Sequence, residues 1–147
     1  TSVGLDRLFL ALMTKCLVEE DVPDADGNTS ERVVLKLPPA LAPVKVAVLP
    51  LLKNKEELTD MAQDIFNQLR PFVPAQYDDK DAIGRRYRRQ DAIGTPYCVT
   101  VDFESLEDHT VTLRDRDTLD QERIAISDLL DRVRSATAME EMLKTLV

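Results

Sequence analysis

The feature that most restricts the fold is an almost unbroken apolar run at residues 44–51, VKVAVLPL. Runs of this kind, rich in β-branched residues, are typical of strands covered on both faces in a parallel sheet. The next segment repeats apolar residues at helical spacing from position 58 to 69 and stops at Pro71. Asn54, with Glu57 three residues later, is interpreted as a capping box at the start of this helix. A strand followed at once by an amphipathic helix predicts a layered α/β architecture.

Later segments continue this alternation of strands and helices. The pattern predicts a short strand within 75–79, a helix over 82–93 weakened by Gly84, strands at 97–103 and 110–114, and helical structure over 127–146 with a break near 135–137. In the strand at 110–114, Val111 and Leu113 are expected to point inward. The predicted fold class is therefore α/β, with a mixed β-sheet flanked by helices.

The first 37 residues have a different character. A helix with one apolar face is expected over residues 4–20, followed by an acidic surface loop at 20–32 and a short strand at 33–35. Prolines then cluster at 38, 39 and 43, where regular structure is disfavoured. We therefore predict a domain boundary in this stretch, which divides the chain into residues 1–37 and 38–147.

Composition excludes several classes of protein. No apolar run approaches the roughly 20 residues of a membrane-spanning helix, so no membrane segment is expected. The first residues have no basic region like that of a secretion signal, so no signal peptide is expected. The first residue is not Met, so the chain is expected to be a piece of a longer one. Its two cysteines, Cys16 and Cys98, are too few for a disulfide framework and predict reduced thiols in a cytoplasmic protein.

The charge is distributed unevenly. The net charge is −8, but four of the 19 basic residues lie at 85–89, so the rest of the chain holds 15 basic against 27 acidic residues and carries −12. An acidic body argues against unspecific binding of nucleic acid over the whole surface. A basic island on such a body indicates a localised anion-binding face.

Two charged segments remain open to two interpretations. The run at 84–89, GRRYRR, offers guanidinium groups for phosphates and a tyrosine for stacking on an unpaired base. It is equally consistent with a solvated helix face paired with nearby aspartates, namely Asp78, Asp79, Asp81 and Asp91. The segment at 112–117, TLRDRD, is either a salt-bridged strand end or a row of donors and acceptors for base edges.

No catalytic or metal site is predicted. The single histidine, His109, lies in an acidic loop with no second feature of a triad. The aspartates at 78–81 lack the spacing of an EF-hand, and the chain contains neither a P-loop nor a GxGxxG motif.

Three segments in this order, 31–54, 83–106 and 109–129, closely resemble the C-terminal part of homodimeric class II glycyl-tRNA synthetases, and the resemblance covers residues 2–132. It implies that residues 38–147 form an anticodon-binding domain and that residues 1–37 are the end of the catalytic domain. The segment SVGLDRLFLAL at 2–12 resembles the third class II motif, so Gly4 and Arg7 are implied to contact ATP.

The first two class II motifs are absent, which implies that this chain alone is not catalytic. The resemblance implies ATP and Mg²⁺ as cofactors of the full-length parent and none in this chain. It implies three partners: the anticodon loop of glycine tRNA, the catalytic domain of the same chain, and a second copy in the parent homodimer. The tail at 133–147 resembles no segment that we can assign to this family.

Residue types and resemblance together select six side chains for contact with tRNA: Arg85, Arg86, Arg89, Arg114, Asp115 and Arg116. An arginine beside a carboxylate suits cytosine, which offers an amino donor and ring acceptors. We expect Arg86, Arg114 and Arg116 at the anticodon loop, with Asp115 as acceptor. Two alternatives remain, a non-enzymatic nucleic-acid accessory protein like the accessory subunit of mitochondrial DNA polymerase and a protein docking module.

Overall fold

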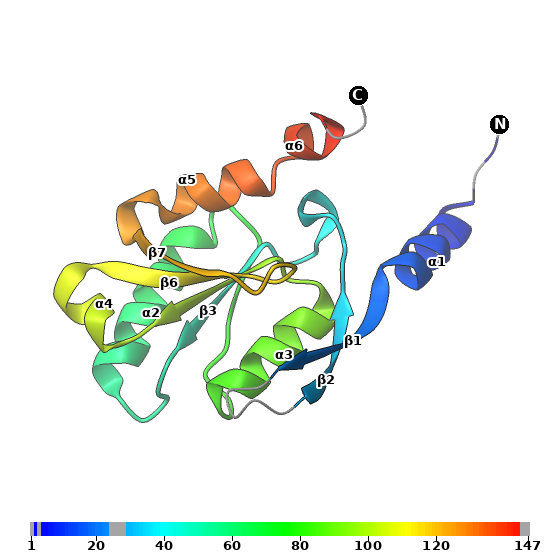
Figure 1. The fold of residues 1–147 in the computed structure, drawn as a ribbon. Helices are drawn as coiled ribbons and strands as arrows, with labels where there is room; N and C mark the ends of the chain where they lie inside the picture. The colour runs from blue at the N-terminus through cyan, green and yellow to red at the C-terminus, as the bar shows by residue number, and fades with distance from the viewer. Residues whose placement is uncertain (1, 3, 24–28, 145–147) are drawn as a thin grey trace.

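A five-stranded sheet with helices on both faces organises the chain (Figure 1). A computed structural model describes residues 2, 4–23 and 29–144. In chain order its elements are α1 (Leu5–Cys16), β1 (Leu17–Pro23), β2 (Thr29–Leu35), the 3₁₀ helix η1 (Pro39–Leu41), β3 (Val46–Pro50), α2 (Glu56–Leu69), β4 (Ala75–Tyr77), α3 (Ile83–Ile93), β5 (Tyr97–Val101), α4 (Phe103–Asp108), β6 (Thr110–Asp115), β7 (Gln121–Ala125), α5 (Ile126–Ala136) and α6 (Met139–Lys144).

The sheet runs in the order β4-β3-β5-β6-β7. Strand β3 is parallel to β4 and β5, whereas β6 is antiparallel to β5 and β7. Every residue of β3 and β5 is buried, as expected for central strands covered on both faces. The predicted α/β class with a mixed, helix-flanked sheet is confirmed.

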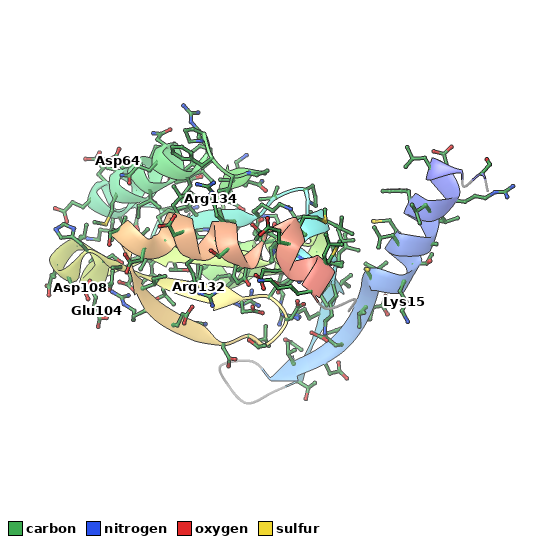
Figure 2. The ribbon with its side chains drawn as sticks, turned by 90° about the horizontal axis from the view of Figure 1, so that it is seen from above. Lys15, Asp64, Glu104, Asp108, Arg132 and Arg134 are labelled. Carbon is green, nitrogen blue, oxygen red and sulfur yellow. The ribbon has the colours of Figure 1, made fainter. Side chains whose placement is uncertain are left out.

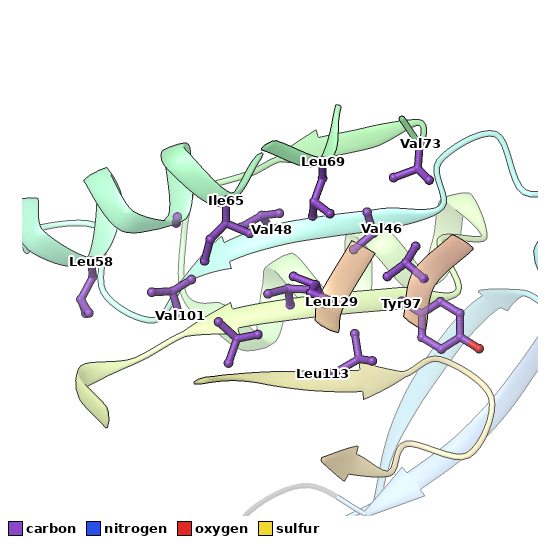
Figure 3. Close-up of a cluster of buried hydrophobic side chains, with 14 residues drawn as sticks. Val46, Val48, Leu58, Ile65, Leu69, Val73, Tyr97, Val101, Leu113 and Leu129 are labelled. Atoms are coloured by element: carbon purple, nitrogen blue, oxygen red, sulfur yellow. The ribbon is translucent and has the colours of Figure 1, made fainter. Parts of the chain in front are cut away.

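The main core lies between the sheet and helices α2 and α5 (Figure 3). Helix α2 buries residues spaced three and four apart, so one face of the helix meets the strands. Its buried side chains are Leu58, Ala62, Ile65 and Leu69. Val111 and Leu113 of β6 point into the same core, as predicted.

The other face of the sheet is covered by α3, through a small cluster around Ala47, Leu49 and Cys98. Strands β1 and β2 form a separate antiparallel ribbon, and β2 packs on α3. Helix α1 precedes this ribbon and extends to one side of the body (Figure 1). Only Cys16 of α1 is buried, and Leu5, Leu8 and Phe9 are exposed.

The N-terminal predictions were partly wrong. The helix ends at Cys16 rather than at residue 20, and residues 17–23 form β1 where a helix end and a loop were expected. The second strand begins at Thr29, so it also takes up the end of the predicted loop; residues 24–28 lie outside the described part. The reason is cross-strand pairing, in which Val18 faces Val34 and Glu20 faces Arg32.

Three local predictions also failed. Helix α2 begins at Glu56 after Lys55, which gives no side-chain cap, so Asn54 and Glu57 form no capping box. The strand expected to reach residue 103 ends at Val101, and α4 follows, capped reciprocally by Asp102 and Ser105. Strand β7 was not predicted.

The remaining elements agree with the sequence patterns. The short strand at 75–77, the helix at 83–93 and the strand at 110–115 are confirmed, and the C-terminal helical stretch breaks between α5 and α6 as expected. Within the described ranges, none of the helices is both long and apolar enough to cross a membrane.

Candidate nucleic-acid interface

A cavity of about 240 Å³ lies where α3, the β1–β2 ribbon and strands β6 and β7 meet. We call it the α3 cavity. Polar and small residues form most of its wall, namely Gly84, Tyr87, Arg88, Asp91, Arg114 and Gln121, and Val22 and Leu119 complete it. It therefore joins the two charged segments, 84–89 and 112–117, that are 23 or more residues apart in sequence.

Arg114 is the central side chain of the α3 cavity. Its Nη1 and Nη2 atoms donate to the two carboxylate oxygens of Asp91 at 2.9 and 3.0 Å. The guanidinium carbon lies 4.7 Å from the ring centroid of Tyr87, a cation–π contact. The Tyr87 hydroxyl and the Thr100 hydroxyl are 2.5 Å apart. These contacts fix both the guanidinium plane and the aromatic ring before any ligand arrives.

Three further residues decide what the α3 cavity can accept. Arg88 is half-buried and donates from Nη2 to the Ser30 hydroxyl at 2.6 Å. Gln121 is exposed at the start of β7 and offers both a donor and an acceptor. A Cβ added at Gly84 would meet no atom within 4 Å, so the helix backbone is open to the cavity there.

Arg86 and Arg116 have a different place from the predicted one. Each is 1% exposed. Arg86 donates to the carbonyls of Lys80 and Asp81 and, through Nη1, to Pro50. Arg86 thus supports the backbone at the end of β3 and before α3, and its guanidinium is buried rather than exposed as expected for RNA contact.

Arg116 binds three backbone carbonyls. It donates to the oxygens of Leu35 at 3.0 Å, Gly94 at 2.8 Å and Leu37 at 2.8 Å, and it pairs with Asp117. These bonds attach the end of β2 to the loop after α3. Arg116 thus holds the ribbon on the body, and its buried guanidinium lies away from the exposed surface on which RNA contact was expected.

Arg89 and Arg85 lie on the outer part of α3. Arg89 pairs with Asp78 at 2.8 Å and Asp81 at 2.7 Å, as the alternative reading of a paired helix face predicted. The hydrogen bond from Arg89 holds the pKa of Asp81 below its usual range. Arg85 is exposed and lies on the same helix. Both remain candidates for phosphate contact.

Asp115 lies on the opposite face of the sheet from Arg114, because successive strand residues alternate. It lines a separate cavity with Tyr97 and Arg132. Asp115, expected as an acceptor at the anticodon loop, therefore faces away from Arg114, and the carboxylate beside Arg114 is Asp91.

Gly4 and Arg7 lie at the start of α1, where Gly4 is the N-cap and its carbonyl accepts from the backbone N–H of Leu8 at 3.1 Å. Arg7 is exposed. Seen from above, α1 with Lys15 stands to one side of the helix that carries Arg132 and Arg134 (Figure 2). Neither Gly4 nor Arg7 lines the α3 cavity.

Sequence reasoning did not select Gln121 or Val22. Gln121 comes to the cavity through β7, which had no clear strand pattern, and Val22 comes through β1, which resembled a loop. Asp91 was noted only as a counter-ion for the arginine run. Its burial beside Arg32 and Arg114 was not visible in the local pattern.

Comparisons with known proteins show which family the chain resembles. A family model described as "Anticodon binding domain" matches residues 45–136. A glycine–tRNA ligase of Rhodopirellula baltica is 49% identical over 134 residues, which are 91% of this chain and 25% of that protein. One of Mycolicibacterium vanbaalenii is 51% identical over 128 residues, which are 87% and 27%.

A solved structure of the RNA binding domain of threonyl-tRNA synthetase from Cryptosporidium parvum is similar in fold. Its TM-score is 0.61 at 26% identity, with 69% of this chain and 25% of that chain covered. The chain spans about a quarter of the length of the curated relatives that it matches.

Proposed function

The chain belongs to the anticodon-binding domain family, and we propose that it binds the anticodon loop of glycine tRNA as the C-terminal part of a glycine–tRNA ligase. Sequence-specific RNA recognition usually targets unpaired bases in loops, which are stacked on aromatic or guanidinium planes and hydrogen-bonded at their edges. The α3 cavity offers all of these groups in one place.

The observation that carries this proposal is the preorganised pair of Arg114 and Tyr87 beside Asp91. A base that enters the cavity meets a fixed guanidinium plane, donors from Arg114 and the amide of Gln121. We expect Arg88 in the cavity wall, and Arg85 and Arg89 on the exposed side of the same helix, to contact phosphate groups, which set position and not specificity. The acidic remainder of the chain disfavours RNA elsewhere.

A binding titration tests this assignment. The chain is titrated with glycine tRNA, a non-cognate tRNA and duplex DNA at two salt concentrations. We expect selectivity for glycine tRNA and a salt dependence that reflects a few phosphate contacts. Duplex DNA bound as well as glycine tRNA would instead support the accessory-protein alternative, which similarity to glycine–tRNA ligases does not favour. No binding to any nucleic acid would support a docking module.

Variants of α3 locate the contact. Gly84→Glu fills the open backbone position with a carboxylate, and Ala92→Glu adds the same charge at an exposed position of the same helix that does not line the α3 cavity. We expect the first to weaken tRNA binding at least about tenfold, or roughly 1.4 kcal/mol, and the second to change it little. Equal effects of the two variants would refute the assignment of this cavity.

Two further variants separate base reading from phosphate contact. Replacing Arg88 by Ala should weaken all tRNAs alike and lower the salt slope by about one. Replacing Gln121 by Ala should cost roughly 1–3 kcal/mol and relax discrimination against an altered anticodon. The measurement is the affinity for glycine tRNA with its anticodon cytosines intact or replaced.

The role of residues 1–37 is proposed from the same similarity. In the longer protein, Gly4 and Arg7 would contact ATP, with Mg²⁺ as a second cofactor, and the partners would be the catalytic domain and a second copy. We place the domain division after residue 37 and expect a cytoplasmic location. The chain alone is expected to be inactive, so glycine-dependent pyrophosphate exchange above background in the pure chain would contradict this assignment.

A further inference from the structure

A second cavity, of about 280 Å³, opens on the opposite face of the sheet, between α5 and the turn that joins β6 to β7. We call it the turn cavity. Its polar wall consists of Tyr97, Asp115, Thr118, Asp120, Glu122 and Arg132. Nothing in the proposed recognition of an anticodon uses these residues, so the inference that follows stands independently of that function.

The acidic groups of the turn cavity are only partly satisfied. Asp115 accepts backbone N–H bonds from Asp117 at 2.7 Å and Thr118 at 3.1 Å, both through Oδ1. Its Oδ2 and the carboxylate of Asp120 receive no hydrogen bond from the described residues. Glu122 accepts from Arg132 at 3.3 Å, and both side chains are about half exposed. Three carboxylates therefore face one guanidinium.

Tyr97 supplies a second and independent observation. It is 8% exposed, and its ring packs in the main core with Val46 and Leu113. Its hydroxyl points away from the buried side chains, toward the β6–β7 turn (Figure 3). Among the described residues it has no hydrogen-bond partner. This unpaired hydroxyl is therefore free to exchange a hydrogen bond with a group that enters the cavity.

The charge and spacing of these groups define the ligand class. The excess of carboxylates favours a cation. Within the described ranges, however, no three acidic, histidine or cysteine side chains converge closely enough to hold a metal ion. A ligand with several N–H donors spread over a larger volume fits separated acceptors better than a point charge does.

We propose that the turn cavity binds an ammonium or guanidinium group, which Asp115, Asp120 and the Tyr97 hydroxyl hold by accepting its hydrogen bonds. Such a group is present on free polyamines and on lysine or arginine side chains of another polypeptide.

The test is a titration of the isotope-labelled chain at neutral pH and constant ionic strength, followed by amide NMR shifts of residues 115–122. The probes are methylguanidinium, butylammonium, spermidine, and lysine and arginine with blocked termini, and sodium and magnesium chlorides are the reference salts. We expect saturable shifts with the nitrogen cations and none with the salts. Tighter binding of spermidine, by tenfold or more, identifies a free polyamine, and binding of the blocked amino acids at the strength of the simple amines identifies a polypeptide side chain.

Three variants complete the test. Tyr97→Phe keeps the buried ring and removes the hydroxyl, and Asp120→Asn removes one charge from an exposed position. Each should weaken methylguanidinium binding at least threefold, whereas Glu107→Gln, an exposed acid in α4, should leave it unchanged. The proposal is overturned by non-saturable shifts, by equal binding of magnesium, or by equal losses in all three variants.

Discussion

Asp91 offers the sharpest test of how the α3 cavity is held together. Its side chain is fully buried and binds two buried arginines, Arg114 at 2.9 and 3.0 Å and Arg32 at 3.2 Å. Arg32 also pairs with Glu20 at 2.5 Å. Replacing Asp91 by Asn keeps the shape but leaves two guanidinium charges facing a neutral amide.

Breaking a buried ion pair by removing one partner costs about 3–5 kcal/mol, because the remaining charge stays desolvated. A domain of this size has a total stability of about 5–15 kcal/mol. We therefore expect Asp91→Asn to remove a large fraction of the free energy of unfolding and to lower the melting temperature by roughly 10 °C or more. Urea unfolding without RNA, followed by circular dichroism, measures the change.

A surface pair is the matched control. Glu141→Gln breaks the exposed ion pair with Lys144 within α6, which should cost about 0.5 kcal/mol or less. In the Asp91→Asn background, Arg32→Met should cost at least about 1 kcal/mol less than it does in the original chain, since its ion pair is already broken. If Asp91→Asn costs no more than the control, the buried cluster does not stabilise the fold and the reasoning is wrong.

Three further predictions concern local chemistry. Gly94 has a φ of +85°, and an added Cβ would lie 3.0 Å from a backbone oxygen of β2, so Gly94→Ala should destabilise the fold by at least about 1–2 kcal/mol. Gly84 lies in an open helical position, so Gly84→Ala should stabilise the fold by about 0.5–1 kcal/mol. Urea unfolding of the two variants compares these effects. Burial raises the pKa of Cys98 to about 12, so in a chain whose other cysteine is replaced by alanine, the thiol should react with a disulfide reagent at pH 8 only as fast as the protein opens. Burial opposes ionisation of Asp102, but hydrogen bonds from the first turn of α4 and from Arg123 outweigh it and lower its pKa below 3.8. This carboxylate therefore stabilises the fold above pH 3.8, and its contribution is lost as the pH falls through the lower folded-state pKa. Asp102→Asn should flatten the loss of stability that acid titration measures in that range.

Local patterns were sufficient for the central strands and the main helices. The β-branched run at 97–101 forms the fully buried β5, because its residues favour strands and both of its faces are covered. Helix α3 forms despite Gly84, since Ile83 and Tyr87 pack on the sheet and Gly94 ends the helix in a left-handed conformation.

Elements whose partners are distant in sequence were harder to predict. Strand β1 contains the acidic run EED and becomes a strand because β2 pairs with it along seven residues. Strand β7 has three exposed residues followed by two half-buried ones, so its alternation is too weak to distinguish from a loop. In both cases pairing, and not the intrinsic preference of the residues, decides the conformation.

The buried arginines explain why the site was only partly predictable. A charged run normally lies in solvent, yet Arg86 and Arg116 are buried because backbone carbonyls at the ends of β2 and β3 and in the loops beside α3 accept their donors. Which carbonyls lack partners depends on the tertiary fold. The sequence could indicate that the arginines contribute to the site, but not which of them bind backbone carbonyls instead.

The segment from Arg114 to Arg116 shows how strand geometry divides one charged motif among three tasks. Arg114 points into the α3 cavity and binds Asp91, Asp115 points to the opposite face and lines the turn cavity, and Arg116 returns to the first face and binds the carbonyls of the ribbon. A period of two fixes this division, so a shift of register by one residue would exchange all three environments at once. The antiparallel pairing of β6 with β5 and with β7 prevents such a shift. The two cavities therefore share one strand but not one set of side chains, and they open on opposite faces of the sheet.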